Sequence, residues 1–318
     1  MKKNLMVVAL AAVALASCNG GFKKGDGGLL YNIHTDKSGP NIAVGDFAVL
    51  DMVIKNDGDS ILKSSYEMGM PQYLILQKPE YKGDVFSGMA LLSEGDSATI
   101  KISADSIFKS RPKPPGFKSK YIIYDLKVEK VIPKGKLTDQ QFQQKYMAYV
   151  TSQMEVIKNH EGDKINKYIA DNKLKTTKTA TGLNYVINKP GAGAVPNVGD
   201  TVVVNYVGKF FNGKVFDTSI KAEAVKAKLQ INPMNPYTPI HIAVGQQKVI
   251  PGWDQGLMLL NKGAKATLIV PSSLAYGEQG NPPIIAPFTP LVFDVEIIDI
   301  IHGAPAPAAT PAPAPAKK

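Results

Sequence analysis

Short runs of apolar and β-branched residues, separated by Gly, Asp and Pro, recur along the chain and predict antiparallel strands joined by turns. Two of the clearest runs are 47–54 and 201–207, and each follows a Val-Gly-Asp sequence. A different pattern stands at 253–260, where Trp-Asp-Gln-Gly-Leu-Met-Leu-Leu predicts a short helix. Because a sheet buries an apolar face only against another element, a short helix packed on a curved sheet is the expected arrangement.

The strand pattern occurs twice, so the chain contains an internal repeat. Val44-Gly45-Asp46 is matched 154 residues later by Val198-Gly199-Asp200, whereas Pro71 is matched 168 residues later by Pro239. The further matches are Ser64-Ser65 with Thr218-Ser219, Ala98 to Ile102 with Ala266 to Val270, and Tyr124 to Leu126 with Phe293 to Val295. We interpret the change of offset as an insertion in the second copy, at about 220–237.

Between the two copies the pattern changes to helical spacing. Residues 138–141 have the sequence of a capping box, which is typical of a helix start. Apolar residues over 142–157 then predict a helix that Gly162 is expected to break, and apolar positions over 165–169 predict a second, shorter helix. Two roles stay open for this segment: a spacer packed on one domain, or an arm for dimerisation.

The N-terminus has the organisation of a secretion signal. Met1-Lys2-Lys3 is basic, and the apolar stretch from Leu5 to Ala16 is too short to span a bilayer. It ends in Leu15-Ala16-Ser17-Cys18, which resembles a bacterial lipobox and implies a lipid on Cys18, the only cysteine. Several acyl chains on one residue anchor stably. No acidic residue follows directly, which favours a lipid-anchored protein of the cell envelope, at the outer membrane facing the periplasm. An ordinary signal peptide is the alternative.

Composition adds few constraints. Hydrophobic residues make up 44% and charged residues 20%, as in globular proteins, and the net charge is +10. Positive charges gather locally at Lys109, Arg111, Lys113, Lys118 and Lys120. We interpret this cluster as a solvent-exposed charged face, and contact with an anionic surface is the alternative. No nucleic-acid-binding motif accompanies the charge, so no nucleic-acid partner is expected. The Ala/Pro-rich tail at 303–318 predicts an extended, disordered segment.

Aromatic residues concentrate in the second copy around the only tryptophan, in Val249-Ile250-Pro251-Gly252-Trp253. The accompanying motifs are Tyr206, Val215-Phe216-Asp217, Ala275-Tyr276-Gly277, Ile284-Ile285 and Leu291-Val292-Phe293-Asp294. Taken one at a time, such aromatics are usually core residues, and Asp217 would serve as a turn cap. Together, in this order, they predict an apolar pocket with a few polar groups, which is typical of a ligand or peptide site.

These motifs resemble the FKBP-type peptidyl-prolyl cis-trans isomerases, strongly over about 179–302 and weakly over about 29–133. The resemblance implies an α+β fold with two FKBP-like domains, each a curved antiparallel sheet wrapped around a short helix, joined by a helical linker. The implied segments are a lipoprotein signal peptide (1–17), a flexible linker (18–28), a degenerate FKBP-like domain (29–133), the helical linker (134–178), an isomerase domain (179–302) and the disordered tail (303–318).

The resemblance also implies roles for residues of the second copy. The implied catalytic residues are Tyr206, Phe216, Asp217, Trp253, Tyr276 and Phe293. The implied substrate-binding residues are Ile240, Val249, Ile250, Ile284 and Ile285. Trp253 would form the pocket floor, Asp217 would pair with Tyr206, and the Tyr276 hydroxyl would donate to a ligand carbonyl. Ile240 departs from the usual Phe and Asn281 from the frequent His. No cofactor and no metal are implied, and the four histidines show no metal-binding spacing.

The first copy lacks most of these groups. The repeat places Met52 at the position of Tyr206, Leu62 at Phe216 and Lys63 at Asp217. The tryptophan position falls near Val85, and Phe108 replaces Tyr276. We therefore expect a domain that keeps the fold and is not catalytic.

The sequence thus predicts a prolyl isomerase that acts on X-Pro bonds of envelope proteins and assists their folding as a chaperone. Its expected partners are proline-containing polypeptides and, through Cys18, a membrane. The alternative is a non-catalytic peptide-binding chaperone or scaffold that uses the same pocket. The oligomeric state stays open.

Overall fold

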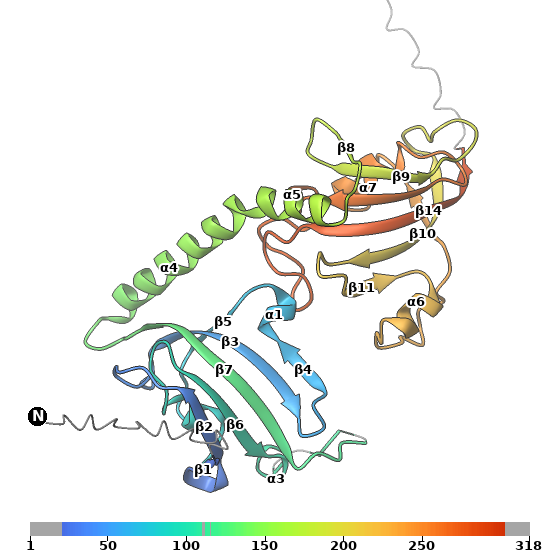
Figure 1. Ribbon diagram of the computed structural model, residues 1–318. Helices are drawn as coiled ribbons and strands as arrows, with labels where there is room; N and C mark the ends of the chain where they lie inside the picture. The colour runs from blue at the N-terminus through green and yellow to red at the C-terminus, as the bar shows by residue number, and fades with distance from the viewer. Residues whose placement is uncertain (1–20, 110–111, 115, 303–318) are drawn as a thin grey trace, which may run out of the picture. The chain divides into compact units, whose positions relative to one another are not determined.

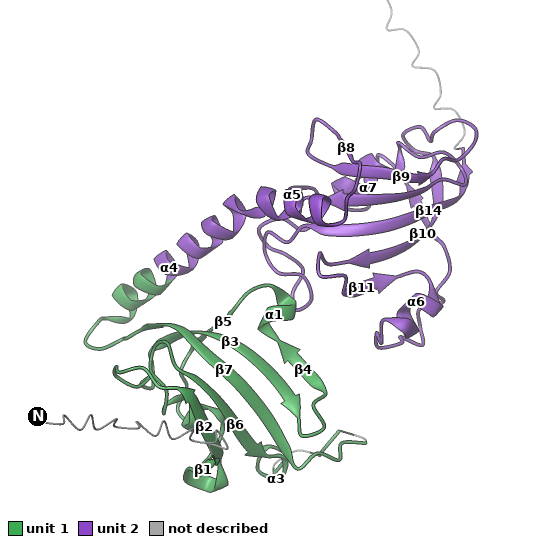
Figure 2. Cartoon of the chain, in the orientation of Figure 1, with its two compact units in different colours: residues 1–146 green, residues 147–318 purple. Residues whose placement is uncertain are grey.

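The computed structural model describes residues 21–109, 112–114 and 116–302. The chain forms two compact units, which divide between Tyr146 and Met147 (Figure 2). Each unit has its own hydrophobic core. The predicted lipidation site at Cys18 and the tail at 303–318 lie outside the described residues. Among the helices of the described part, none is both long and apolar enough to cross a membrane.

Each unit is built mainly from strands, with short helices between them (Figure 1). The first unit contains β1 (Lys23–Lys24), η1 (Asp26–Gly28), β2 (Leu30–Thr35), β3 (Phe47–Asn56), β4 (Ile61–Ser64), α1 (Ser65–Met68), β5 (Gln72–Ile75), α2 (Val85–Met89), β6 (Ser97–Ser103), α3 (Ala104–Ile107) and β7 (Tyr121–Ile132). Two helices follow, α4 (Asp139–Asn159) and α5 (Glu161–Asp171). The second sheet and its helices comprise β8 (Thr177–Lys178), β9 (Asn184–Lys189), β10 (Thr201–Lys209), β11 (Val215–Thr218), α6 (Lys221–Lys226), β12 (Ile240–Ala243), α7 (Pro251–Leu257), β13 (Lys265–Val270), η2 (Ser272–Leu274) and β14 (Leu291–Ile301).

The two sheets have the same topology. Each has seven strands, and every pairing is antiparallel. The first sheet runs β4-β3-β7-β6-β2-β1 with β5 also paired to β3, and the second runs β11-β10-β14-β13-β9-β8 with β12 also paired to β10. The α+β fold of two antiparallel sheets with a helical connection, which the sequence predicts, is therefore confirmed.

The helix of each unit packs closely on its sheet because a glycine faces the strand. In α7, a Cβ atom on Gly256 would lie 2.6 Å from Cδ1 of Leu268 on β13. In α2, a Cβ on Gly88 would lie 2.7 Å from Cδ1 of Ile100 on β6. Gly88 and Gly256 are therefore equivalent positions. Val85 lies three residues before Gly88, as Trp253 lies three residues before Gly256, so Val85 occupies the position of the tryptophan. α7 begins two residues earlier than the predicted Trp253, because Pro251 suits the first turn of a helix.

The strand register verifies the repeat residue by residue. Val53 pairs with Ser64 in the first sheet, and Val207 pairs with Thr218 in the second. A serine hydroxyl accepts a hydrogen bond from the strand at the same place in both: Ser65 Oγ from Met52 N and Ser219 Oγ from Tyr206 N, each at 2.9 Å. The extra segment at 220–237 contains α6.

The first of the two helices between the sheets begins at the predicted capping box, but the break between the helices lies earlier than predicted. The capping box is formed: Thr138 N donates to Gln141 Oε1 at 3.0 Å, and Gln141 N donates to Thr138 Oγ1 at 3.3 Å. However, Gly162 does not break α4. The interruption lies at His160, and Gly162 lies within α5. A glycine is tolerated there because the first turn of a helix lacks intrahelical acceptors for its N–H groups.

Candidate active site

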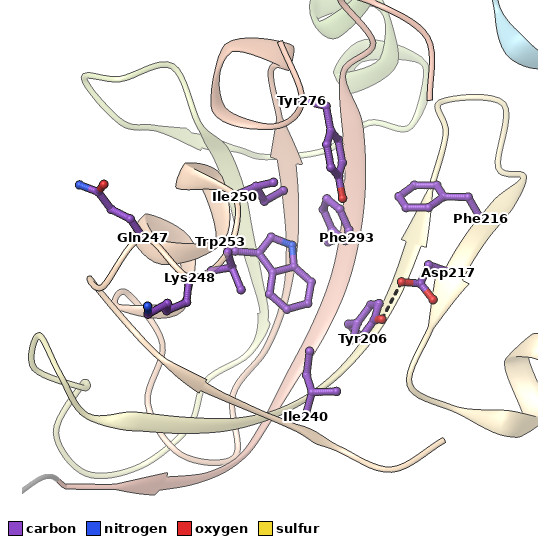
Figure 3. Close-up of a pocket in the computed structure, with 11 residues that line it drawn as sticks. Tyr206, Phe216, Asp217, Ile240, Gln247, Lys248, Ile250, Trp253, Tyr276 and Phe293 are labelled. Atoms are coloured by element: carbon purple, nitrogen blue, oxygen red, sulfur yellow. Dashed lines mark hydrogen bonds between the residues drawn. The ribbon is translucent and has the colours of Figure 1, made fainter. Parts of the chain in front are cut away.

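The second unit contains a cavity of about 500 Å³ lined by its sheet, by helix α7 and by loops. Its lining residues come from β10, β11, β12, α7, β14 and the loops that join them: Tyr206, Phe216, Asp217, Ile240, Gln247, Lys248, Val249, Ile250, Trp253, Tyr276 and Phe293 (Figure 3). The structure therefore brings together nine of the eleven pocket residues that the family resemblance implies. Their chemical roles stay predictions.

Aromatic rings form the floor and one wall of this cavity. The Trp253 side chain is 5% exposed, and its ring meets Tyr206 and Phe293 edge-on at centroid distances of 5.0 and 5.2 Å. Phe216 meets Phe293 edge-on at 5.8 Å. Such contacts hold large rings in fixed orientations. Trp253 Nε1 is buried, and no group of the described residues accepts a hydrogen bond from it.

Phe216 reaches the cavity because β11 carries a bulge. Gly208 pairs with Asp217 and Lys209 with Val215, so Phe216 has no partner across the ladder. A bulge re-aims the side chain of the extra residue, and bulges are frequent beside active sites. Gly208 leaves room for the ring, since a Cβ there would lie 2.8 Å from Cζ of Phe216.

Asp217 makes two hydrogen bonds that serve different ends. Its Oδ2 accepts from the Tyr206 hydroxyl at 2.7 Å, and its Oδ1 accepts from Thr218 N at 2.8 Å. The turn-capping interpretation of Asp217 and the pairing with Tyr206 thus both describe real contacts. Burial raises the pKa of the Tyr206 hydroxyl, and the hydrogen bond to Asp217 raises it further. Tyr206 is consequently a neutral hydroxyl at physiological pH.

Tyr276 supplies a second hydroxyl near the first. Burial raises its pKa, and the negative charge of Asp217 adds to the effect. The site therefore presents two protonated phenols and one carboxylate around an aromatic floor (Figure 3). This inventory can bind an apolar ring and accept or donate a few hydrogen bonds. Within the described residues there is no group of His, Cys, Asp and Glu side chains suited to a metal ion.

A buried carboxylate on α7 holds the remaining wall in place. Asp254 accepts from Gly245 N at 3.1 Å and from Gln247 N at 2.8 Å. It thereby fixes the loop that leads to Lys248 and Val249. Gln247 and Lys248 line the cavity, and sequence reasoning missed both. Their position directly before the predicted Val249 was the available signal.

Two predicted residues do not line this cavity. Ile285 is 3% exposed and belongs to the hydrophobic core of the second unit. Ile284 is 52% exposed. These two consecutive residues of an irregular loop lie in opposite environments, so the sequence pattern alone did not separate them.

The equivalent region of the first unit differs in each polar group. The residue at the bulge is Leu62, and its neighbour Lys63 pairs with Ile54 as Asp217 pairs with Gly208. Lys63 Nζ donates to Gln72 Oε1 at 2.7 Å, so these positions bind each other rather than a tyrosine. A wider cavity of about 920 Å³ lies beside Val85, lined in addition by Glu80, Tyr81, Lys82, Asp84, Phe86, Ile102, Ser106, Ile107, Lys109 and Tyr124.

Known proteins share the second part of the chain. Residues 193–298 match the model of a family described as FKBP-type peptidyl-prolyl cis-trans isomerase. FK506-binding protein 1 of Rhizopus delemar is 38% identical over 120 residues, which cover 37% of this chain and 98% of that protein. The probable FKBP-type peptidyl-prolyl cis-trans isomerase FkpA of Neisseria meningitidis serogroup B is 38% identical over 194 residues, or 58% of this chain.

The match to the longer relatives is partial. The chain spans 65% of the length of the Neisseria protein and 59% of the length of FkpA of Escherichia coli. The crystal structure of E. coli FkpA aligns with a TM-score of 0.38 at 34% identity, over 52% of this chain and 75% of that one.

Proposed function

We propose, since this chain belongs to the FKBP-type peptidyl-prolyl cis-trans isomerase family, that the pocket of its second unit catalyses rotation about X-Pro peptide bonds. The observation that carries the proposal is the aromatic floor. Trp253, flanked by Tyr206 and Phe293, offers a flat apolar ring on which a proline ring can lie in the cavity.

The chemistry needs no covalent step. Resonance gives the peptide bond partial double-bond character, and the barrier to rotation is about 18–20 kcal/mol. The twisted transition state loses this resonance and is less charge-separated than the planar amide, so an apolar pocket favours it. Lowering the barrier by about 6 kcal/mol would accelerate rotation about 10⁴-fold.

The polar groups would orient the substrate. In this proposal the proline ring lies on Trp253, and the neutral hydroxyl of Tyr276 donates a hydrogen bond to a substrate carbonyl. The Asp217 carboxylate holds the Tyr206 hydroxyl by a 2.7 Å hydrogen bond, so that both groups keep one orientation beside the rotating bond. A fixed arrangement of this kind costs no reorganisation during the reaction.

The rate of cis-trans exchange of a short X-Pro peptide in the presence of the full chain tests the activity. Phe216→Ala should lower the rate at least tenfold, because it removes a cavity wall from the bulge. Leu62→Ala alters the bulge residue of the first sheet and is the matched control, which should leave the rate unchanged. Tight peptide binding without turnover would support the non-catalytic chaperone or scaffold instead.

We infer that the first unit is a non-catalytic copy. The Lys63–Gln72 hydrogen bond and the small side chain of Val85 support this inference, because Lys63 stands at the position of Asp217 and Val85 at the position of Trp253. Loss of isomerase activity only on alteration of the second pocket would agree with it.

We also propose that the protein is a lipid-anchored component of the cell envelope, in the outer membrane and facing the periplasm. The lipobox-like sequence that ends in Cys18 supports this proposal. Its clients would be proline-containing envelope polypeptides. Cys18→Ser should move the protein from the membrane fraction to the soluble fraction, and unchanged membrane retention would refute the anchor.

A further inference from the structure

Helix α5 makes a direct polar contact with the loop that carries Tyr276. The Glu161 carboxylate accepts two hydrogen bonds from Ser272: from the backbone N at 2.5 Å and from Oγ at 2.6 Å. Ser272 is 3% exposed and opens the short helix η2, so both of its donors are satisfied by one side chain from 111 positions earlier in the chain. Two hydrogen bonds to one carboxylate fix the position of both residues.

Ser272 in turn holds the backbone on both sides of Tyr276. Its carbonyl oxygen accepts from Ala275 N at 2.9 Å and from Gly277 N at 2.8 Å. Gly277 has a φ of +59°, which a side chain disfavours, and so turns the chain directly after the tyrosine. The location of the Tyr276 ring is therefore set by a residue that Glu161 fixes.

Helix α5 is itself fastened to the outer face of the second sheet. Ile165 packs with Ile269 of β13 and Val292 of β14, which are both fully buried. One turn later, Tyr168 stacks on Phe211 with ring centroids 4.4 Å apart. The helix is thus a rigid support from which the Glu161 side chain reaches the loop.

We propose that Glu161 is a positioning residue for the isomerase reaction. It acts through Ser272 on the orientation of Tyr276, at the edge of the cavity, and touches no substrate itself. This inference rests on the proposed function of the pocket. A merely structural Glu161 would affect the stability of the unit without any specific dependence on the Tyr276 hydroxyl.

The first measurement compares kcat/KM for an X-Pro peptide across full-chain variants. Glu161→Ala should lower kcat/KM about 5- to 20-fold, because a misplaced substrate-contacting group loses its near-attack geometry. Asp163→Ala removes an exposed acid from the same first turn of α5 and is the matched control, with kcat/KM unchanged. Glu161→Gln keeps an acceptor for Ser272 N and a donor for Ser272 Oγ, so it should restore most of the activity.

The second measurement is a double-mutant cycle with Tyr276→Phe. If Glu161 acts by positioning the Tyr276 hydroxyl, then Glu161→Ala should cost less than about twofold once that hydroxyl is absent. Thermal unfolding of each variant, followed by Trp253 fluorescence, identifies any variant whose second unit is not folded at the assay temperature. If Glu161→Ala is not folded, Glu161→Gln carries the test alone. It should then show a smaller loss of kcat/KM than expected for alanine, and that loss should disappear in the Tyr276→Phe background.

The outcomes separate the two proposals. An inactive wild-type chain would overturn the proposed function and this inference with it. An active wild-type chain whose Glu161→Ala variant matches Asp163→Ala would overturn this inference alone. Equal effects of Glu161→Ala with and without the Tyr276 hydroxyl would also overturn it, since the loss would then be general.

Discussion

At the scale of single residues, Asp217 is the group whose charge the proposed chemistry uses. Its carboxylate accepts from the Tyr206 hydroxyl and also caps the backbone at Thr218. An asparagine retains an oxygen acceptor, so it can preserve one of these contacts without the charge. The two functions of Asp217 can therefore be separated by one substitution.

We expect Asp217→Asn to lower kcat/KM about fivefold, because a hydrogen bond to a charged acceptor is worth about 1 kcal/mol more than a neutral one. The melting temperature of the second unit should stay close to that of the wild type, because asparagine also serves turns well. Steady-state exchange of an X-Pro peptide and a thermal melt provide both numbers. A fully active Asp217→Asn would leave desolvation in the aromatic pocket as the main source of rate.

The raised pKa of Tyr206 makes a second prediction, about stability at high pH. Burial is the main cause that raises the pKa of Tyr206 in the folded state, and the hydrogen bond to Asp217 adds to it. A tyrosine in an unfolded chain titrates at about pH 10. The unfolded state therefore loses its proton first. This contribution to stability is complete below about pH 10 and is lost as the pH rises toward the folded-state pKa.

Urea unfolding at about pH 8 and about pH 10.5 measures this effect. The free energy of unfolding of the wild type should fall more between these two conditions than that of Tyr206→Phe, which has no hydroxyl to ionise. Lysines titrate in both proteins and cancel in the comparison. An equal fall in both would show that the Tyr206 hydroxyl is not linked to folding.

Sequence reasoning identified most of the cavity and erred where backbone geometry decides. Trp253, Phe216 and Asp217 were found because their motifs occur in a fixed order. Ile284 and Ile285 were assigned together although their exposures are 52% and 3%. The Glu161–Ser272 contact had no sequence signal, since it depends on how a helix docks on a distant strand.

At the scale of elements, close packing of α7 on β13 depends on Gly256. We expect Gly256→Ala to destabilise the second unit by about 1–3 kcal/mol, since its Cβ would lie 2.6 Å from Leu268 and force a shift. Gly162→Ala in α5 is the control: apart from its chain neighbours and the adjoining helix backbone, no atom lies within 4 Å of the added Cβ. That control should stabilise by about 0.4–1 kcal/mol, because alanine lowers the entropy of the unfolded chain.

Chemical unfolding followed by Trp253 fluorescence measures both glycine variants. If Gly162→Ala also destabilised the unit, a steric clash of the added methyl group would not be the cause of the effect. The prediction of Gly256→Ala would be wrong if its unfolding midpoint equalled that of the wild type.

Strands were easier to predict than helix limits. The run of apolar, β-branched residues at 201–207 predicts a strand, and in β10 Val202, Val203 and Val204 are all buried. Helix ends depend on single residues and their caps. The pattern placed the break of α4 at Gly162, whereas the chain interrupts the helix at His160, whose Nδ1 lies 2.7 Å from the carbonyl oxygen of Val156.

At the scale of the whole molecule, two separate cores predict that the two units unfold independently. Trp253 is the only tryptophan, so its fluorescence reports the second unit alone. Gly88→Ala, whose Cβ would lie 2.7 Å from Ile100, should lower the stability of the first unit by about 1–3 kcal/mol. The fluorescence transition should stay within about 0.5 kcal/mol of the wild type while the circular-dichroism transition shifts. Equal shifts in both signals would indicate one cooperative molecule.

The overall architecture was predictable because the sequence contains an internal repeat. Offsets of 154 and 168 residues located both copies and the insertion, and the strand register reproduces the matches on both sides of the insertion. The attachment of α5 was not predictable. Its apolar residues fit a spacer as well as a dimerisation arm, and neither pattern specifies Ile269 and Val292 as the residues on which the helix docks.

The docking of α5 also decides where this chain can be divided. A protease cut or a gene recombination near residue 178 would keep every strand from β9 onward and strip the outer face of β13 and β14 of its cover. Ile269 and Val292, which are fully buried, would then meet water. The smallest fragment that keeps the second unit intact therefore begins before Glu161. A recombined gene that encoded only the sheet would produce a protein with an exposed apolar surface and without the Glu161 contact to the loop of Tyr276.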